Sequence, residues 1–404
     1  MSKWEWKKIS TLVTKCQNIK WDKVPLDDSR LYIDLSSVNK DTQCIEDVSE
    51  VNVENAPSRA KQIIHENDVL FATTRPTQKR VCIVERQYDN QICSTGFCVL
   101  RPLDCLESKY LFYCLLSDDF YSYIKPLEKG ANYPAVTDGD VKNYEIPVPP
   151  LSEQKRIVKF LDEEFSKIET LKTNAETNLK NAKELFETTL EKELNPQSRH
   201  SGRSEESSAE LPSGWEWKKI GDVCSLMSGD SKANMLPDGK IAYVKVADMN
   251  LECNQTEIRS SSRFVDMREN DKRIFPVGTT IFPKRGGAIL TNKKRMTSIP
   301  ICCDLNIMGV IPGEEVYCKY LYMFFMGIDF SKLFNGASIP QINNVDVNPL
   351  LIPLPPLSVQ KEIVARLDKL SENIKRLEAN YKQIIANCDE LKKTILKQTF
   401  QGGN

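Results

Sequence analysis

The chain carries one long sequence pattern twice. Residues 146–162 read IPVPPLSEQKRIVKFLD and residues 352–368 read IPLPPLSVQKEIVARLD, so twelve of seventeen positions are identical at an offset of 206 residues. Each copy also opens alike, because Trp4–Ile9 and Trp215–Ile220 both read WEWKKI. This period is far longer than the units of about 20–50 residues that stack into solenoids. We therefore interpret the chain as a tandem duplication of a whole domain together with the segment that follows it.

Between these matching segments the two copies differ almost completely. Scattered landmarks persist, such as Gly130, Pro134 and Asp140 in the first copy, which return 206 residues later. A shared frame around divergent interiors predicts two similar scaffolds that recognise different targets. The 404 residues suffice for two or three domains, and 40% apolar with 27% charged residues is ordinary for a globular protein.

Several features predict a soluble, cytoplasmic protein. The sequence contains no run of about 18 uncharged apolar residues that could cross a membrane. Its first residues, MSKWEWKKIS, lack the basic, apolar and small-residue regions of a signal peptide. The 13 cysteines are odd in number, widely spread and without a C-x-x-C pair, which favours reduced thiols in a cytosol.

The first part of each copy, residues 1–150 and 211–356, has the pattern of a compact α+β domain. Short apolar runs such as Val69–Ala72 and Thr280–Phe282 have the length of strands, and Gly, Pro, Asn and Asp separate such runs. A helical segment around Lys109–Phe112 follows the strands, and its counterpart occurs in the second copy.

The second part of each copy is predicted to be a long helix, over residues 151–195 and 357–400. Prolines force an extended chain just before each helix, and Ser152 or Ser358 then supplies an N-cap oxygen. The first helix has a looser apolar seam, which Lys172 interrupts. In the second helix, apolar residues alternate at steps of three and four, as in an a/d heptad repeat: Leu367, Leu370, Ile374, Leu377, Tyr381, Ile384, Cys388, Leu391 and Ile395.

A long helix with one apolar stripe needs a partner, and the nearest candidate is the helix of the other copy. With approximate two-fold symmetry the two helices pair antiparallel, which brings Phe400 next to Trp4. Residues 196–210 are polar and Ser-rich, as flexible linkers are, and residues 401–404 form a short tail. We therefore predict an α+β fold in which two globular domains are joined by two long antiparallel coiled-coil helices with pseudo-two-fold symmetry.

The sequence contains no constellation that we interpret as catalytic. It has two histidines, and His200 lies in the predicted linker, while His65 is interpreted as a strand-end residue without a chemical role. A phosphate-binding loop, a dinucleotide-binding turn and the Asn/Asp-Pro-Pro-aromatic motif of adenine methyltransferases are all absent. We accordingly expect no catalytic residues, no metal and no cofactor in this chain.

Three segments closely resemble the specificity (S) subunit of type I restriction–modification enzymes: Pro149–Lys155, Pro355–Lys361 and Leu211–Trp217. The resemblance covers nearly the whole chain, although the first domain lacks the Leu-Pro-x-Gly lead-in of the second. It implies that each globular domain is a target-recognition domain for half of a split, asymmetric site in double-stranded DNA. The helices are implied to act as a spacer and as the docking surface for two modification (methyltransferase) subunits, which carry S-adenosylmethionine. Restriction (motor-nuclease) subunits are implied to join through the same core.

Local basic patches point to the candidate DNA contacts, because the net charge of −1 predicts no global attraction. The stretch from Pro283 to Cys303 has five basic and no acidic residues, and the first copy has a smaller patch at a comparable place. Basic side chains there would position the phosphates, while polar ones would read base edges. The candidates are Arg75, Thr77, Lys79, Arg80 and Tyr133 in the first copy, and Lys284, Arg285, Lys293, Lys294, Arg295 and Gln341 in the second.

Other functions stay open at this point. The chain could serve as the specificity module of another adenine-methylation-based defence complex, or as a coiled-coil protein scaffold that does not bind DNA. An enzyme with an embedded nuclease or methylase is disfavoured by the missing motifs. Salt-dependent binding to duplex DNA would exclude the scaffold, since it is expected only where basic loops face phosphate.

Overall fold

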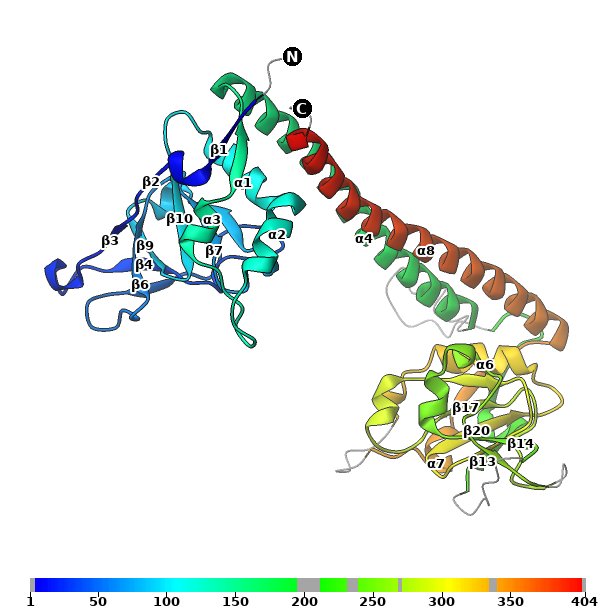
Figure 1. Ribbon diagram of the computed structural model, residues 1–404. Coiled ribbons are helices and arrows are strands. Elements are labelled where there is room, and N and C mark those ends of the chain that lie inside the picture. The colour runs from blue at the N-terminus through cyan, green and yellow to red at the C-terminus, as the bar shows by residue number, and fades with distance from the viewer. Residues whose placement is uncertain (1–3, 195–210, 231–238, 268–270, 334–339, 402–404) are drawn as a thin grey trace, which may run out of the picture. The chain divides into compact units, whose positions relative to one another are not determined.

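Two structural units make up the chain, of which the first draws on two separate stretches of sequence and the second on one continuous stretch (Figure 1). Unit 1 contains residues up to 176 and from 382 onward, and unit 2 contains residues 177–381. The structure is a computed structural model that describes residues 4–194, 211–230, 239–267, 271–333 and 340–401. Among these residues, no helix is both long and apolar enough to cross a membrane.

In unit 1, a four-stranded sheet (order β2-β10-β7-β8) and a five-stranded sheet (order β3-β6-β9-β4-β5) accompany a pair formed by β1 and β11. Most pairings are antiparallel, and β4 with β9 is parallel. The strands are β1 Glu5–Lys8, β2 Val13–Thr14, β3 Gln17–Asn18, β4 Arg30–Ile33, β5 Ser49–Val51, β6 Ala60–Ile64, β7 Val69–Ala72, β8 Val81–Ile83, β9 Gln91–Ser94, β10 Phe97–Pro102 and β11 Glu145–Val148. The helices are α1 Ser108–Leu116, α2 Asp118–Ile124, α3 Asp138–Lys142, the first part of α4 Leu151–Leu194 and the last part of α8 Leu357–Gln401.

Unit 2 repeats this plan with sheets of order β13-β20-β17-β18-β15 and β16-β14-β19 and the pair β12-β21. Its strands are β12 Glu216–Lys219, β13 Cys224–Ser228, β14 Ile241–Val244, β15 Glu257–Ile258, β16 Phe264–Val265, β17 Thr280–Pro283, β18 Arg295–Thr297, β19 Ile301–Cys303, β20 Ile307–Pro312 and β21 Leu351–Leu354. Its helices are α5 Ile220–Val223, α6 Cys318–Met326, α7 Asn344–Val347, the last part of α4 and the first part of α8 Leu357–Gln401.

The central strand β7 explains why both sequence copies contain fully apolar runs. Its side chains alternate between two faces, as they do in every strand. Val69 and Phe71 join the core that contains α1, while Leu70 and Ala72 join a second core on the other face. A strand buried on both faces cannot alternate apolar with polar residues, so it appears in sequence as a continuous apolar run.

The matching segments at the two ends of each copy pair with each other. Strands β1 and β11 run antiparallel with Trp6 opposite Pro147, and β12 pairs with β21 in the same register with Trp217 opposite Pro353. Proline cannot donate to a sheet, but it is tolerated in a two-stranded pair with one open edge. Each frame therefore closes its own domain just before the long helix begins.

A buried glutamine ties the start of helix α4 to the domain. The Gln154 side chain is fully buried. Its Oε1 accepts from the backbone N–H of Glu107 at 2.8 Å, where α1 begins. Its Nε2 donates to the carbonyls of Cys105 at 3.0 Å and Pro149 at 2.9 Å. One amide therefore bonds to three backbone groups and joins the segment before α1 to the segment before α4.

Unit 2 contains the same contact at Gln360. Its Oε1 accepts from Tyr317 N at 2.8 Å, and its Nε2 donates to the carbonyls of Glu315 at 2.9 Å and Pro355 at 2.8 Å. This glutamine is also fully buried. The shared Pro-Pro-Leu-Ser-x-Gln-Lys sequence is thus explained by a structural role, in which prolines bring the chain out of the sheet and glutamine holds the helix in place.

The long helices pair antiparallel within each unit, as predicted. In unit 1, Lys172 on α4 forms an ion pair with Asp389 on α8 at 3.0 Å, and Glu169 with Lys392 at 2.7 Å. In unit 2, Glu193 forms an ion pair with Arg366 at 2.7 Å. Residue numbers rise on one helix as they fall on the other. Lys172, which interrupts the apolar seam in sequence, therefore makes a polar contact across the pair.

The two chain ends reach the same core, also as predicted. Phe400 is buried in the core of unit 1 and meets the Tyr110 ring edge-on at 5.5 Å, and Trp4 packs against the same cluster. Together with the helix pairing, this confirms the predicted α+β class with two globular domains and long antiparallel helices.

The predicted a/d seam is only half buried by this pairing. Leu367, Ile374 and Cys388 are buried, whereas Leu377, Ile384 and Leu391 keep 41–46% of their surface exposed. The three buried residues share one heptad position and the three exposed residues share the other, so the partner helix covers mainly one of the two positions of the seam. The first helix has exposed leucines at the matching places, Leu171 and Leu185.

We predict that Gln154→Ala destabilises unit 1 by about 3 kcal/mol, because it leaves three backbone groups without their partner. Gln360→Ala is expected to do the same to unit 2. Chemical denaturation followed by tryptophan fluorescence measures the loss. Lys155→Ala, an exposed neighbour on the same helix, serves as the control and should change the free energy of unfolding by less than about 0.5 kcal/mol. Equal stability of Gln154→Ala and Lys155→Ala would contradict the proposed role of the Gln154 hydrogen bonds in holding the start of α4 to the domain.

Candidate nucleic-acid interface

Both basic patches of the sequence lie on connections between antiparallel strands. The first basic loop, residues 73–80, leads from β7 to β8 and contains a short 3₁₀ turn, Pro76–Gln78. The second basic loop, residues 284–294, leads from β17 to β18 and contains the 3₁₀ turn Gly286–Thr291. The two loops are therefore equivalent connections in the two units, although their sequences and lengths differ.

In unit 1, a second segment supports the first basic loop. Arg75 N donates to the Pro134 carbonyl at 2.7 Å, and Val136 N donates to the Thr73 carbonyl at 2.9 Å. These bonds place Tyr133, which is 70% exposed, beside Arg75. The Arg75 guanidinium carbon lies 4.9 Å from the centre of the Tyr133 ring, which is a cation–π contact.

Unit 2 repeats the support with different residues. Gly286 N donates to the Pro340 carbonyl at 2.8 Å, and Ile342 N donates to the Lys284 carbonyl at 2.9 Å. The intervening residues, Arg285 and Gln341, face each other in an isolated bridge. Sequence reasoning identified Pro134 and Pro340 as repeated landmarks but missed that they hold the basic loops.

The remaining first-copy candidates differ in how many contacts their side chains make within unit 1. Thr77 is exposed. Lys79 forms an ion pair with Asp118 at 3.1 Å and lies 4.5 Å above the Tyr121 ring. The Arg80 guanidinium is half-buried and donates to backbone carbonyls of the loop that follows β4, at Leu35 and Val38. Lys79 and Arg80 thus hold the loop within unit 1, while Arg75 stays exposed beside Tyr133 of the supporting segment.

The structure corrects the prediction for Lys294 and Arg295. Lys294 is 1% exposed, and its Nζ donates to Asn292 Oδ1 at 2.7 Å and to a backbone carbonyl. Burial lowers the pKa of Lys294 to about 8. The buried Arg295 guanidinium donates to the backbone carbonyls of Asn254 and Met249. Both charges are used within the fold, so neither residue is assigned to DNA.

Lys284 is nearly buried as well, with its Nζ 2.8 Å from Ser228 Oγ, so we remove it from the phosphate contacts. Burial and the neighbouring Arg285 charge lower the Lys284 pKa. Lys293 is half-buried and donates to the Asn250 side chain. Arg285 is exposed, and the half-buried Gln341 donates to Asn343 at 2.6 Å. In unit 2 the candidate DNA contacts are therefore mainly Arg285, Lys293 and Gln341.

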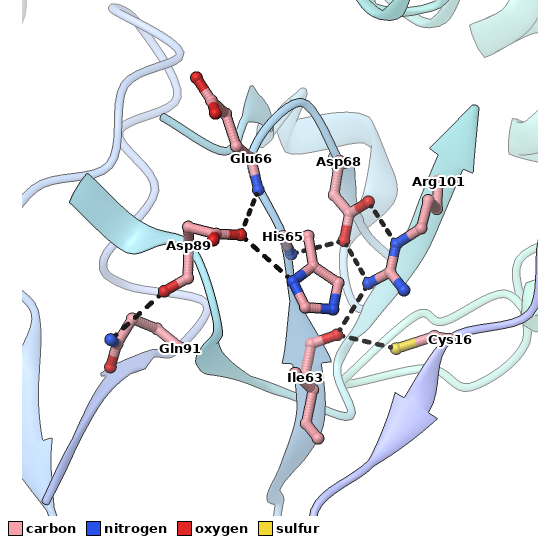
Figure 2. Close-up of polar contacts among 8 residues, drawn as sticks. All are labelled: Cys16, Ile63, His65, Glu66, Asp68, Asp89, Gln91 and Arg101. Atoms are coloured by element: carbon pink, nitrogen blue, oxygen red, sulfur yellow. Dashed lines mark hydrogen bonds and ion pairs between the residues drawn. The ribbon is translucent and has the colours of Figure 1, made fainter. Parts of the chain in front are cut away.

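His65 lies at the end of a strand, as its sequence context predicts. It directly follows β6, and its Nδ1 lies 3.2 Å from Asp89 Oδ1 (Figure 2). Beside it, the buried Asp68 accepts from the Arg101 guanidinium through both oxygens at 2.8 Å and from His65 N at 2.9 Å. These contacts fix the turn that leads into β7 and so to the first basic loop. Across the described residues, no cluster of His, Cys, Asp or Glu is arranged to hold a metal.

Comparison with known proteins places the chain in a family. The family described as "Type I restriction modification DNA specificity domain" matches residues 1–181 and again residues 212–386. The MjaIX specificity subunit of Methanocaldococcus jannaschii is 25% identical over 301 residues, covering 72% of this chain and 68% of the relative. The HindI specificity subunit of Haemophilus influenzae is 22% identical over 393 residues, covering 80% and 85%.

Solved structures agree in fold over the whole chain. The HsdS subunit from Thermoanaerobacter tengcongensis matches with a TM-score of 0.71 and 27% identity, covering 100% of this chain and 97% of that one. A chain from a study of complex assembly and conformational transition in the type I R-M system matches with a TM-score of 0.83 and 26% identity, covering 100% and 99%. The chain therefore belongs to the type I restriction modification DNA specificity family, and it contains two copies of the family's domain.

Proposed function

We propose that this chain is the DNA-recognition subunit of a type I restriction–modification system and reads a split, asymmetric site in double-stranded DNA. The observation that carries the proposal is the equivalence of the two basic loops. Each loop follows the equivalent strand of its unit, β7 or β17, and is held by the equivalent proline, Pro134 or Pro340. The exposed side chains of the two loops nevertheless differ completely. One frame with two different reading surfaces suits two unequal half-sites.

The charge distribution supports contact with a duplex. Exposed or half-exposed cations gather on the loops, at Arg75 in unit 1 and at Arg285 and Lys293 in unit 2. Cations on such loops neutralise phosphates and set the register of a domain on DNA, while polar neighbours such as Thr77 and Gln341 meet base edges.

The long helices supply the proposed docking surface for modification subunits. We define the exposed stripe as the uncovered apolar residues Leu171, Leu185, Leu377, Ile384 and Leu391. Exposed apolar stripes of this kind mark contacts with partner proteins. Each unit has its own part of the stripe, since Leu171 and Leu391 belong to unit 1 and Leu185 and Leu377 to unit 2. We therefore propose two modification subunits, which carry S-adenosylmethionine, with restriction subunits joining the same core.

The chain itself is proposed to be non-catalytic. Its family is the recognition component of such systems, and the modification and restriction chemistry would belong to the partners. Incubating the purified chain with DNA, Mg²⁺ and S-adenosylmethionine tests this, because cleavage or methylation by this chain alone would overturn the assignment. A scaffold without DNA binding would show no salt-dependent affinity for duplex.

The first prediction from this proposal concerns the second basic loop. Replacing Arg285 and Lys293 together by alanine should weaken the binding of the assembled complex to every duplex. Each lost phosphate contact should reduce the slope of log affinity against log salt by about 0.9. Salt titrations of duplex binding measure the slope.

The control removes the same number of charges from the shared frame, by Lys218→Ala with Lys219→Ala on β12. It should leave both affinity and slope unchanged. An equal slope in the loop variant and in the wild type would mean that the second basic loop does not face phosphate.

The second prediction concerns the exposed stripe. Leu377→Asp should abolish or strongly reduce co-purification with the modification subunit while leaving thermal unfolding nearly unchanged, because 41% of the leucine surface already faces solvent. Ile374→Asp, three residues away and 5% exposed, should instead lower the unfolding temperature, since it buries a charge in the helix pair. If Leu377→Asp still assembled normally, the stripe would not be the docking surface.

A further inference from the structure

Left-handed backbone flanks the 3₁₀ turn of the first basic loop on both sides. Arg75 has φ 50° and ψ 53°, and Lys79 has φ 56° and ψ 37°. This region crowds the Cβ of an L-residue against its own backbone, so residues other than glycine, asparagine and aspartate rarely adopt it. Two long cationic side chains at such positions in one short loop are therefore unusual.

The second basic loop has left-handed backbone at the two corresponding places, but at residues that suit it. Gly286 occupies the place of Arg75, because both N–H groups donate to the equivalent proline carbonyl, and its φ is 69°. Asn292 occupies the place of Lys79, because both close the 3₁₀ turn, and its φ is 50°. The left-handed backbone of these two positions thus favours glycine and asparagine. Unit 1 nevertheless has an arginine and a lysine there. Strain kept in a fold marks a position where the side chain itself is needed.

The two strained cations are used differently. Lys79 is bound within the unit by Asp118 and Tyr121. Arg75 is exposed, and in the part of the chain that the structure describes its guanidinium makes no hydrogen bond or ion pair beyond the stacking on Tyr133. Ring stacking orients the planar fork and leaves its N–H donors for a ligand.

Building on the proposed function, we infer that Arg75 reads a guanine in the first half-site, with Tyr133 and the left-handed backbone fixing its direction. A phosphate contact needs only a positive charge, which an unstrained neighbour would supply equally well. A planar guanidinium of fixed orientation matters where two acceptors must be bonded simultaneously. Guanine presents such a pair, O6 and N7, in the major groove, and this is the commonest specific arginine contact. Arg75 is therefore assigned as a specificity-determining residue, and Lys79 as a residue that positions the loop.

Three substitutions separate charge, fork and backbone strain. Arg75→Lys keeps the charge and the strained backbone but removes the fork. Arg75→Ala removes the side chain and keeps the strain, and Arg75→Gly removes both. Each variant is assembled with the modification subunits of the wild type, and its modified sites are mapped by sequencing genomic DNA, with duplex affinities and unfolding temperatures measured in parallel.

We expect Arg75→Lys to lose discrimination at one guanine position of the first half-site by about 5- to 150-fold, while the second half-site stays intact. Arg75→Ala and Arg75→Gly should lose the same discrimination. Arg75→Gly should unfold at a higher temperature than Arg75→Ala, because glycine accepts the left-handed backbone. Arg285→Lys is the matched control, and it should leave every position of the first half-site unchanged.

The inference is overturned if Arg75→Lys keeps full discrimination while Arg75→Ala weakens binding equally to all duplexes, since that pattern is a phosphate contact. It is also overturned if Arg75→Ala is as stable as Arg75→Gly, because the position would then be unstrained. A wild-type complex that modifies no defined two-part site would instead reject the proposed function, and this result is seen before any variant is compared.

Discussion

A single buried amide in each unit joins the globular domain to its long helix. Gln154 and Gln360 each bond to three backbone groups: the carbonyl of a proline just before the long helix, and a carbonyl and an N–H in the segment that leads into α1 or α6. Buried backbone groups must be paired, so the helix cannot change its angle to the domain without breaking these bonds. The direction in which a basic loop points is thereby coupled to the helix on which partners are proposed to dock.

The frame explains how one architecture can serve two targets. Strand pairing between the ends of each copy closes the domain, and an equivalent proline holds each basic loop. None of these contacts depends on the exposed residues of the loop. Such residues can therefore change without cost to folding, except where the backbone is left-handed. At Arg75 the requirements of the fold and of the proposed reading of DNA disagree, whereas at Gly286 they do not.

Much of the fold could be predicted from the sequence because its signals are local or repeated. The proline-rich entry predicts where α4 begins, but the predicted N-cap role of Ser152 is wrong, because the helix already starts at Leu151. The heptad spacing predicts that the long helices pair, and the internal duplication predicts that they pair antiparallel. The candidate site was harder to predict, because a run of basic residues does not reveal which ones face solvent. Arg285 and Lys294 belong to one run, yet Arg285 is exposed, whereas Lys294 is buried at 1% exposure against the Phe330 ring.

By itself, then, the sequence determined the duplication, the α+β class, the long helices and the two loops that carry the basic patches. These follow from periodicity, from apolar patterning and from residues that dictate backbone conformation, all of which act over short distances. Only the tertiary structure decided which cations are bound inside a unit and that Arg75 stacks on Tyr133. It also decided that Leu377 stays exposed while Ile374 is buried. The physical reason is that exposure and pairing depend on neighbours distant in sequence, which the fold alone brings together.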